Sequence, residues 1–272
     1  MKDYALELAS KREGYNAKLN TIREYLQAYI LRILHTDSLF KNSAFLGGTA
    51  LRFLYNLPRF SEDLDFSLLK ADSSSFLDSI NKLKGELTLA GYDVSIKYSE
   101  ENTVKYALIK FEELMHDLGL SPHKDQLLSI KIDIDTNPPL GAGFKPQIIN
   151  KYFPLSFMFY DLSSLLAGKI HAVLCRNYTK GRDYFDLCWY LSRWKDCVPN
   201  IEFLVNALKQ TDYQGQLPDN DNWRQILYKA VEDVDWKLIY KDVENFLENE
   251  IDNIVFTKEN ILKLIKMDKS FS

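Results

Sequence analysis

The sequence predicts an α+β protein, in which a half that mixes strands and helices precedes a half that is helical almost throughout. Apolar and polar residues alternate in several segments before residue 155, most clearly over 127–136. After residue 155 the apolar residues recur at spacings of three and four, the period of a helix. We therefore expect two domains, at 1–155 and 156–272.

The elements of the first half begin with a long helix and lead to an acidic strand. Apolar residues at helical spacing predict a helix over 1–36. A short apolar strand at 44–46, a glycine pair and a helix at 49–55 come next. A loop then leads into a strand at 64–69.

Further strands follow before the helical half begins. An amphipathic helix is expected at 76–91, and alternating segments predict strands at 92–100, 103–113 and 127–136. The prolines and glycines of 138–146 break the pattern, so this segment is expected to be a connection. A polar linker is expected at 212–222, among helices at 161–177, 182–194, 201–210, 222–236, 237–249 and 258–267.

Length and composition indicate a folded protein with an acidic balance. Of the 272 residues 46% are hydrophobic, enough for one large domain or two closely packed ones. The net charge of −4 means that a nucleic-acid substrate would need a local basic surface. Three cysteines without CxxC spacing indicate free thiols in a reducing compartment. Since the sequence shows neither a secretory leader nor an apolar run of roughly 18 residues, we expect a cytoplasmic protein that does not enter a membrane.

A glycine pair stands between the predicted strand at 44–46 and its helix. Gly47 and Gly48 have no Cβ, so their backbone N–H groups can approach a ligand closely. The helix that begins at Thr49 adds unpaired N–H groups and the positive end of its dipole, which favour a phosphate. An ordinary tight turn with an N-cap would have the same sequence.

Paired carboxylates occur on two predicted strands. Asp63 and Asp65 point the same way and lie roughly 6.5–7 Å apart along the chain. Their two negative charges repel each other, and a hard cation such as Mg²⁺ bound between them would relieve this repulsion. Asp133 and Asp135 share the polar face of the strand at 127–136. All of these acids could face solvent. Together they could instead hold two metal ions roughly 3.5–4 Å apart for displacement at phosphorus.

These segments join into two longer motifs. The first, FLGGTALRFLYNLPRFSEDLDFSLL, combines the glycine turn with Arg-Phe-Ser-x-Asp-Leu-Asp. The second, KIHAVLCRNYTKGRDYFDL, has Lys169 on one helix and Arg-Asp-x-x-Asp at the start of the next. In this order they resemble the AbiEii/AbiGii-type nucleotidyltransferases, the toxins of type IV toxin–antitoxin systems. The resemblance spans roughly residues 40–190.

The resemblance implies a DNA polymerase β-like nucleotidyltransferase domain, with a mixed sheet flanked by helices, followed by an α-helical domain. It implies Asp63 and Asp65 as metal ligands, with Asp133 as the third and Asp135 as its alternative. The other implied nucleotide-binding residues are Gly47, Gly48, Thr49, Arg52, Ser61 and Lys169, and the catalytic residues are Asp63, Asp65, Lys169 and Asp186.

The second motif has a plainer alternative. Asp183 and Asp186 lie one turn apart near a helix start and could simply complement its dipole, while Lys169 could be solvated. If the motif is functional, we expect Asp186 to orient Lys169 or the acceptor. We expect Asp183 to pair with Arg176 or Arg182.

The implied activity is transfer of a nucleoside monophosphate from an NTP to a hydroxyl, with Mg²⁺ as the metal and Mn²⁺ as an alternative. The implied acceptor is the 3′ end of tRNA, and the implied partner is a cognate antitoxin. Basic residues of the helical half could contact the RNA: Arg176, Lys180, Arg182, Arg193 and Lys195. Two alternatives stay open, a protein or small-molecule hydroxyl as acceptor and a nucleotide-binding regulator without catalysis.

Overall fold

The chain divides into two compact units. The structure, a computed structural model, describes residues 1–70, 75–176, 178–248 and 255–266. Unit 1 comprises Met1–Asn56, Phe60–Pro138 and Pro146–Phe159; unit 2 comprises Leu57–Arg59, Pro139–Lys145 and Tyr160–Ser272. Two short segments from within the first 155 residues therefore belong to unit 2. The expected domains at 1–155 and 156–272 stay a prediction.

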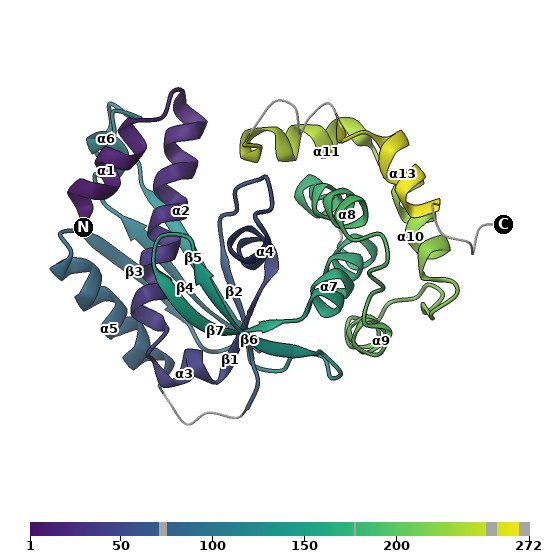
Figure 1. The fold of residues 1–272 in the computed structure, drawn as a ribbon. Helices are drawn as coiled ribbons and strands as arrows, with labels where there is room; N and C mark the ends of the chain where they lie inside the picture. The colour runs from purple at the N-terminus through teal and green to yellow at the C-terminus, as the bar shows by residue number, and fades with distance from the viewer. Residues whose placement is uncertain (71–74, 177, 249–254, 267–272) are drawn as a thin grey trace. The chain divides into compact units, whose positions relative to one another are not determined.

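A seven-stranded mixed sheet confirms the predicted fold class (Figure 1). Its order is β3-β4-β5-β2-β1-β7-β6, and β2 pairs in parallel with β5 but antiparallel with β1. The strands are β1 (Ser43–Leu46), β2 (Leu64–Leu68), β3 (Val94–Ser99), β4 (Val104–Phe111), β5 (Leu128–Asp135), β6 (Phe144–Asn150) and β7 (Pro154–Tyr160).

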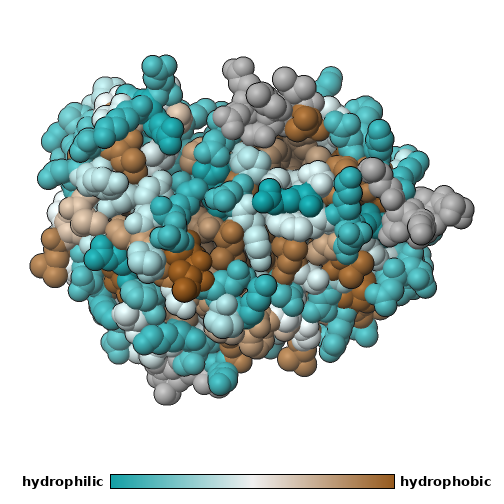
Figure 2. Space-filling model, in the orientation of Figure 1, coloured by the Kyte–Doolittle hydropathy of each residue, from teal (hydrophilic) through white to brown (hydrophobic). Residues whose placement is uncertain are grey.

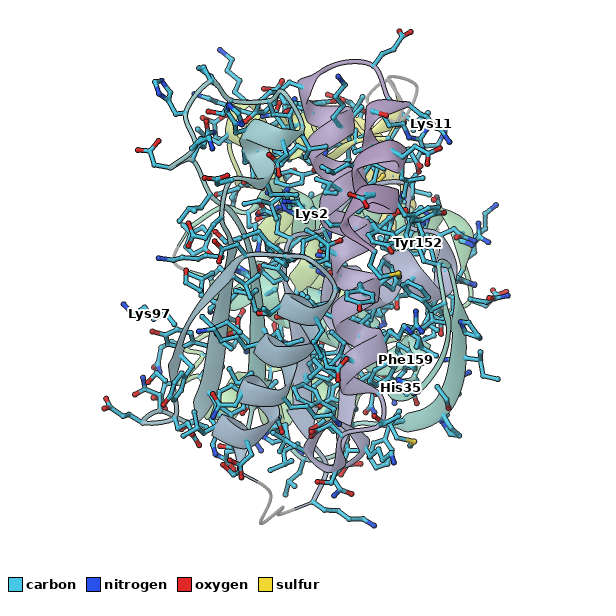
Figure 3. The ribbon with its side chains drawn as sticks, turned by 90° about the vertical axis from the view of Figure 1, so that its left-hand side faces the viewer. Lys2, Lys11, His35, Lys97, Tyr152 and Phe159 are labelled. Carbon is cyan, nitrogen blue, oxygen red and sulfur yellow. The ribbon has the colours of Figure 1, made fainter. Side chains whose placement is uncertain are left out.

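Strand β5 is central because it has a partner on each side and a buried apolar face. Ile130, Ile132 and Ile134 are fully buried, as their alternation predicts. Helices α1, α2 and α5 lie over one face of this sheet (Figures 1 and 3), and α2 packs on β5 while α5 packs on β3. Their bounds, with that of α4, which contacts β1 and β2, are α1 (Lys2–Ser10), α2 (Tyr15–Leu34), α5 (Phe76–Leu89) and α4 (Gly47–Tyr55).

Two parts of the sequence-based prediction are wrong in unit 1. The expected helix over 1–36 is two helices, because the chain reverses at Gly14 with a φ of 81°. The connection expected at 138–146 ends at residue 143, because β6 begins at Phe144, and β7 occupies the place where the helical half was expected to start. The prolines in these segments hide the alternation of apolar and polar residues. Strand β7 is short and apolar, and it is stabilised by pairing with β1, which is far away in sequence; Phe45 of β1 stands opposite Phe159 of β7.

Unit 2 contains the expected helices. Helix α7 packs on α8, α9 and α10, and α8 also packs on α11 and α13. Segment 212–222 joins α9 to α10 without helix or strand, as predicted. Residues 177, 249 and 267, at three predicted helix ends, lie outside the described residues. The helices are α7 (Leu162–Cys175), α8 (Gly181–Arg193), α9 (Ile201–Gln210), α10 (Trp223–Glu232), α11 (Trp236–Val243) and α13 (Lys258–Lys266), with a short 3₁₀ helix, η1 (Glu244–Phe246).

Hydrophilic residues cover most of the surface seen in Figure 2, and apolar residues form smaller separate patches. Within the described ranges, none of the helices combines the length and apolarity needed to cross a bilayer.

We expect Ile132→Ala to destabilise the protein by roughly 2–5 kcal/mol, because it leaves a cavity in the fully buried face of the central strand. Urea unfolding measures the change. Val104→Ala, at a position of β4 that is 43% exposed, is the control and should shift stability by less than about 0.5 kcal/mol. Equal effects of the two variants would contradict the central position of β5.

Candidate active site

The parallel pairing of β2 and β5 brings two of the predicted carboxylates side by side. Asp65 stands opposite Asp133, while Asp135 stands opposite Ser67. Residues in register on neighbouring strands point to the same face, so Asp65 and Asp133 project together. Both residues are half-buried. The register therefore favours Asp133 over Asp135 as the acid that joins Asp65.

Lys131 neutralises Asp133 in this structure. Its Nζ lies 2.7 Å from Asp133 Oδ1 and 2.8 Å from Oδ2. The contact with Oδ1 is close in distance but lacks hydrogen-bond geometry, which leaves that buried oxygen without a hydrogen bond. Asp135 differs, because it accepts a bond from the Asn137 N–H and burial raises the pKa of its carboxyl.

The acidic pair fits a metal that shares its coordination with substrate. Among the described residues, no group of three or more His, Cys, Asp or Glu side chains is arranged to hold an ion. Mg²⁺ is nevertheless commonly bound through one or two carboxylates, with phosphates and waters at its other positions. Asp65 and Asp133 offer that donor set, and the unsatisfied Asp133 oxygen has a lone pair to give. The described residues do not arrange Asp63, Asp65 and Asp133 as a closed cage, and this three-carboxylate set stays a prediction.

The glycine turn is built against the acidic pair. Gly47 begins α4 with a φ of 81°, and a Cβ added there would overlap the carboxylate of Asp65. Two residues later, the fully buried Thr49 donates its hydroxyl to the carbonyl of Asp63 at 2.5 Å. The hydroxyl of Thr49 thus holds the loop that contains Asp63. Gly47 needs to be glycine for two separate reasons, its backbone conformation and its distance from Asp65.

Ser61 and Arg52, both predicted nucleotide-binding residues, have different surroundings. The carbonyl of Ser61 accepts a hydrogen bond from Gln27 Nε2 at 3.0 Å, while its hydroxyl is unbonded within the described part of the chain. Arg52 is buried, its Nε donates to Glu24 at 2.5 Å, and its guanidinium lies over the ring of Phe60. The charge of Arg52 is thus engaged in the core, and its role in nucleotide binding stays a prediction.

The second motif forms a buried ion cluster within unit 2. Asp186 is fully buried, and its two oxygens accept parallel hydrogen bonds from Arg59 Nε and Nη2, each 2.6 Å long. Lys169 Nζ lies 2.7 Å from the same carboxylate. A two-pronged arginine contact of this kind sets the orientation of both groups. The first motif already contains Arg59, four residues before Asp63, but the sequence indicated no role for it, whereas it did for Asp186 and Lys169.

Asp183 completes the cluster from the same face of α8. It accepts a hydrogen bond from Lys169 at 2.9 Å and lies 3.0 Å from Arg176 Nε. Burial alone would raise the pKa of Asp183, but Lys169 and Arg176 outweigh it and hold that pKa below its usual value. Burial would likewise lower the pKa of Lys169, yet Asp183 and Asp186 raise it. Lys169 is therefore a buried ammonium between two carboxylates and not a solvated side chain. Asp183 also lies in the first turn of α8, where the helix-dipole alternative placed it.

The comparison with known proteins decides the family. The profile described as nucleotidyl transferase AbiEii toxin, type IV toxin–antitoxin system, matches residues 29–257. The chain belongs to the AbiEii family. It is thus a nucleotidyltransferase, of a family whose members are toxins of type IV toxin–antitoxin systems, use an NTP with a divalent metal, and have an antitoxin partner.

Solved structures agree with this AbiEii assignment at the level of the fold. A candidate nucleotidyltransferase from H. pylori is similar with a TM-score of 0.52 and 18% identity, covering 89% of each chain. JHP933 from Helicobacter pylori is similar with a TM-score of 0.50 and 18% identity, covering 90% of this chain and 88% of its own. No protein with a curated description matches the chain.

Gly47→Ala should reduce nucleotidyl transfer by tenfold or more, because the added methyl group displaces Asp65 and alanine disfavours the positive φ by roughly 1–2 kcal/mol. Initial rates with labelled NTP measure the loss, and circular dichroism checks folding. The matched control is Gly85→Ala, inside α5, where a Cβ meets nothing within 4 Å. It should keep activity and gain up to about 1 kcal/mol of stability. Full activity of Gly47→Ala would contradict the close approach of turn and acid.

We expect Asp186→Asn to destabilise the protein by roughly 3–5 kcal/mol, since it leaves Arg59 and Lys169 buried with one carboxylate fewer. Urea unfolding measures the change, and the exposed Asp196→Asn serves as the control. A shift no larger than that of the control would show that the ion cluster contributes no net stability.

Proposed function

We propose that this AbiEii-family protein uses Mg²⁺ to transfer a nucleoside monophosphate from an NTP to the 3′-terminal hydroxyl of tRNA. The observation that carries the proposal is the pairing of Asp65 with Asp133 directly beside the glycine turn. Two adjacent carboxylates are costly unless a cation joins them, and the turn next to them begins α4, where the first N–H groups of a helix are suited to phosphate. Cognate antitoxin control and a cytoplasmic location belong to the same proposal.

Each residue of unit 1 has a distinct part in this reaction. Asp65 and Asp133, with Asp63 at the strand entrance, would hold the metal, which would neutralise the triphosphate when bound. The N–H groups of Gly47 and Gly48 would bind phosphate oxygens, joined by the free hydroxyl of Ser61. Thr49 would position the acidic loop through its bond to Asp63. The acceptor hydroxyl releases its proton to solvent and its oxygen forms a bond to the α-phosphorus, while the bond from that phosphorus to the bridging oxygen breaks and pyrophosphate leaves.

Lys169 and Asp186 are the proposed catalytic residues of unit 2. Lys169 would stabilise the charge of the leaving pyrophosphate as an ammonium whose protonation the two acids maintain. Asp186 would orient Lys169, which it contacts at 2.7 Å. Both roles rest on the family pattern together with this contact.

The decisive experiment incubates the purified protein with total tRNA, Mg²⁺ or Mn²⁺ and each α-³²P-labelled NTP in turn. We expect labelled tRNA with at least one NTP, and a loss of about 100-fold or more in Asp63→Asn/Asp65→Asn and in Asp133→Asn. The matched control is Asp135→Asn, on the same strand but opposite Ser67, which should retain most activity.

Three outcomes would contradict parts of the proposal. Label that migrates with protein and resists ribonuclease would make a protein hydroxyl the acceptor. Nucleotide and metal binding without pyrophosphate release under any condition would indicate a regulator without catalysis. A greater loss of transfer activity in Asp135→Asn than in Asp133→Asn would make Asp135, and not Asp133, the metal ligand.

A further inference from the structure

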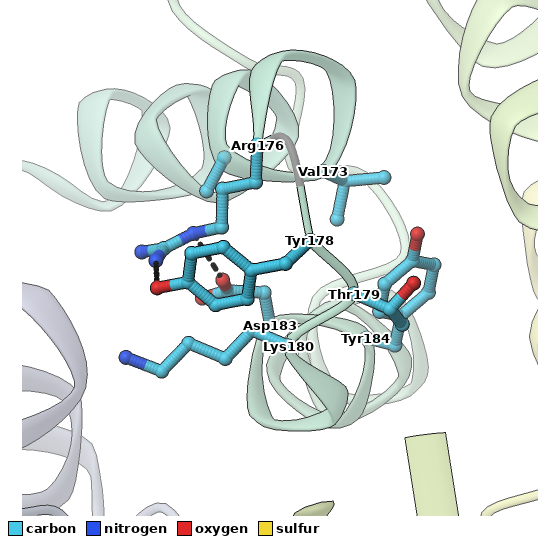
Figure 4. Close-up of a pocket in the computed structure, with 8 residues that line it drawn as sticks. Val173, Arg176, Tyr178, Thr179, Lys180, Asp183 and Tyr184 are labelled. Atoms are coloured by element: carbon cyan, nitrogen blue, oxygen red, sulfur yellow. Dashed lines mark hydrogen bonds and ion pairs between the residues drawn. The ribbon is translucent and has the colours of Figure 1, made fainter. Parts of the chain in front are cut away.

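A small polar pocket opens in unit 2 beside the start of α8 (Figure 4). Its volume is about 100 Å³, which leaves room for a group the size of a phosphate. The side chains that concern us are those of Arg176, Tyr178, Lys180 and Asp183. In Figure 4, Arg176 and Lys180 extend to the same side of the pocket, on either side of the Tyr178 ring.

Most cations around this pocket already have a carboxylate. Arg176 pairs with Asp183 and also donates to the Tyr178 hydroxyl at 2.8 Å. Arg182 lies 3.8 Å from Asp242 and over the ring of Phe246. Lys180 differs, since its ammonium has no hydrogen bond or ion pair within the described part of the chain.

The surroundings of Lys180 are short of negative charge. Lys180 is half-buried, and its burial lowers the pKa of the ammonium. Arg182, Arg176 and Lys169 lower that pKa further, and Asp183 opposes them only in part. Lys180 is also the N-cap of the 13-residue helix α8, whose first N–H groups and dipole add positive potential. Lys169 and Arg176 already neutralise Asp183, so an external anion would supply the missing charge.

We propose that the pocket lined by Lys180, Arg176 and Tyr178 is a binding site for a single phosphate group. Lys180 provides a point charge, the Arg176 guanidinium provides further N–H donors, and the Tyr178 hydroxyl can turn toward the ligand. Two sources can supply the phosphate, a phosphodiester of an RNA acceptor or the triphosphate of a nucleotide. The RNA source rests on the function proposed above, whereas the nucleotide source needs only the family activity.

Binding without turnover separates these sources. The full chain is titrated without divalent metal, using fluorescently labelled tRNA in one arm and inorganic tripolyphosphate in the other. Lys180→Gln should weaken the binding of one of the two ligands by roughly tenfold at low salt. If that ligand is tRNA, the slope of log K against log salt should shrink by about 0.7–0.9, the contribution of one phosphate contact. Lys180→Arg should retain binding.

The exposed Lys209→Gln on α9 is the matched control, because it removes the same charge from the same unit outside the pocket. Melting temperatures verify that each variant folds, and Lys180→Glu provides a second, larger change of charge at the same position. Weakened tRNA binding assigns the site to the acceptor, and weakened tripolyphosphate binding assigns it to the nucleotide. If Lys180→Gln and Lys180→Glu bind both ligands no more weakly than Lys209→Gln, the proposal is overturned. That result would leave transfer to tRNA untouched, because the labelling experiment does not depend on Lys180.

Discussion

The cost of burying a carboxylate without a positive charge beside it is the constraint that organises both units. In unit 1 the carboxylate of the buried Glu24 accepts a hydrogen bond from Arg52 and lies 3.3 Å from the ammonium of Lys151. In unit 2 the fully buried Asp186 binds Arg59 and Lys169. Charges arranged in this way are fixed in orientation, because each carboxylate oxygen already has its donor. They are therefore rigid supports for neighbouring residues that must act on a substrate.

The acidic pair of unit 1 meets this constraint less completely than Asp186 does. Two register partners, Asp65 and Asp133, share one face of the sheet, and Lys131 leaves one oxygen of Asp133 without a hydrogen bond. Lys180 of unit 2 shows the opposite imbalance, a half-buried cation that forms no ion pair with any described residue. Local charge that the fold does not balance is the physical mark of a ligand site, since binding supplies the missing partner. A protein with a net charge of −4 can in this way present local sites of either sign.

Much of the fold follows from periodicity within single segments. The alternation of β5 predicted both its strand and its buried face, and helical spacing predicted the helices of unit 2. Strands β6 and β7 were missed because their stability comes from pairing with residues far away in sequence, as between β7 and β1. The split of the first helix at Gly14 is a single-residue effect that the apolar spacing on either side conceals.

The sequence by itself determined the chemistry available to this protein. Its two motifs identify the family and name Asp63, Asp65, Lys169 and Asp186, because residue type and spacing are local properties of the chain. Only the tertiary structure decided which groups meet. The register of β2 and β5 placed Asp133, and not Asp135, opposite Asp65. The fold paired Asp186 with Arg59 across 127 positions of sequence, and the carbonyl of Asp63 accepts a hydrogen bond from the hydroxyl of Thr49. Such choices depend on strand register and helix packing, which no single segment encodes.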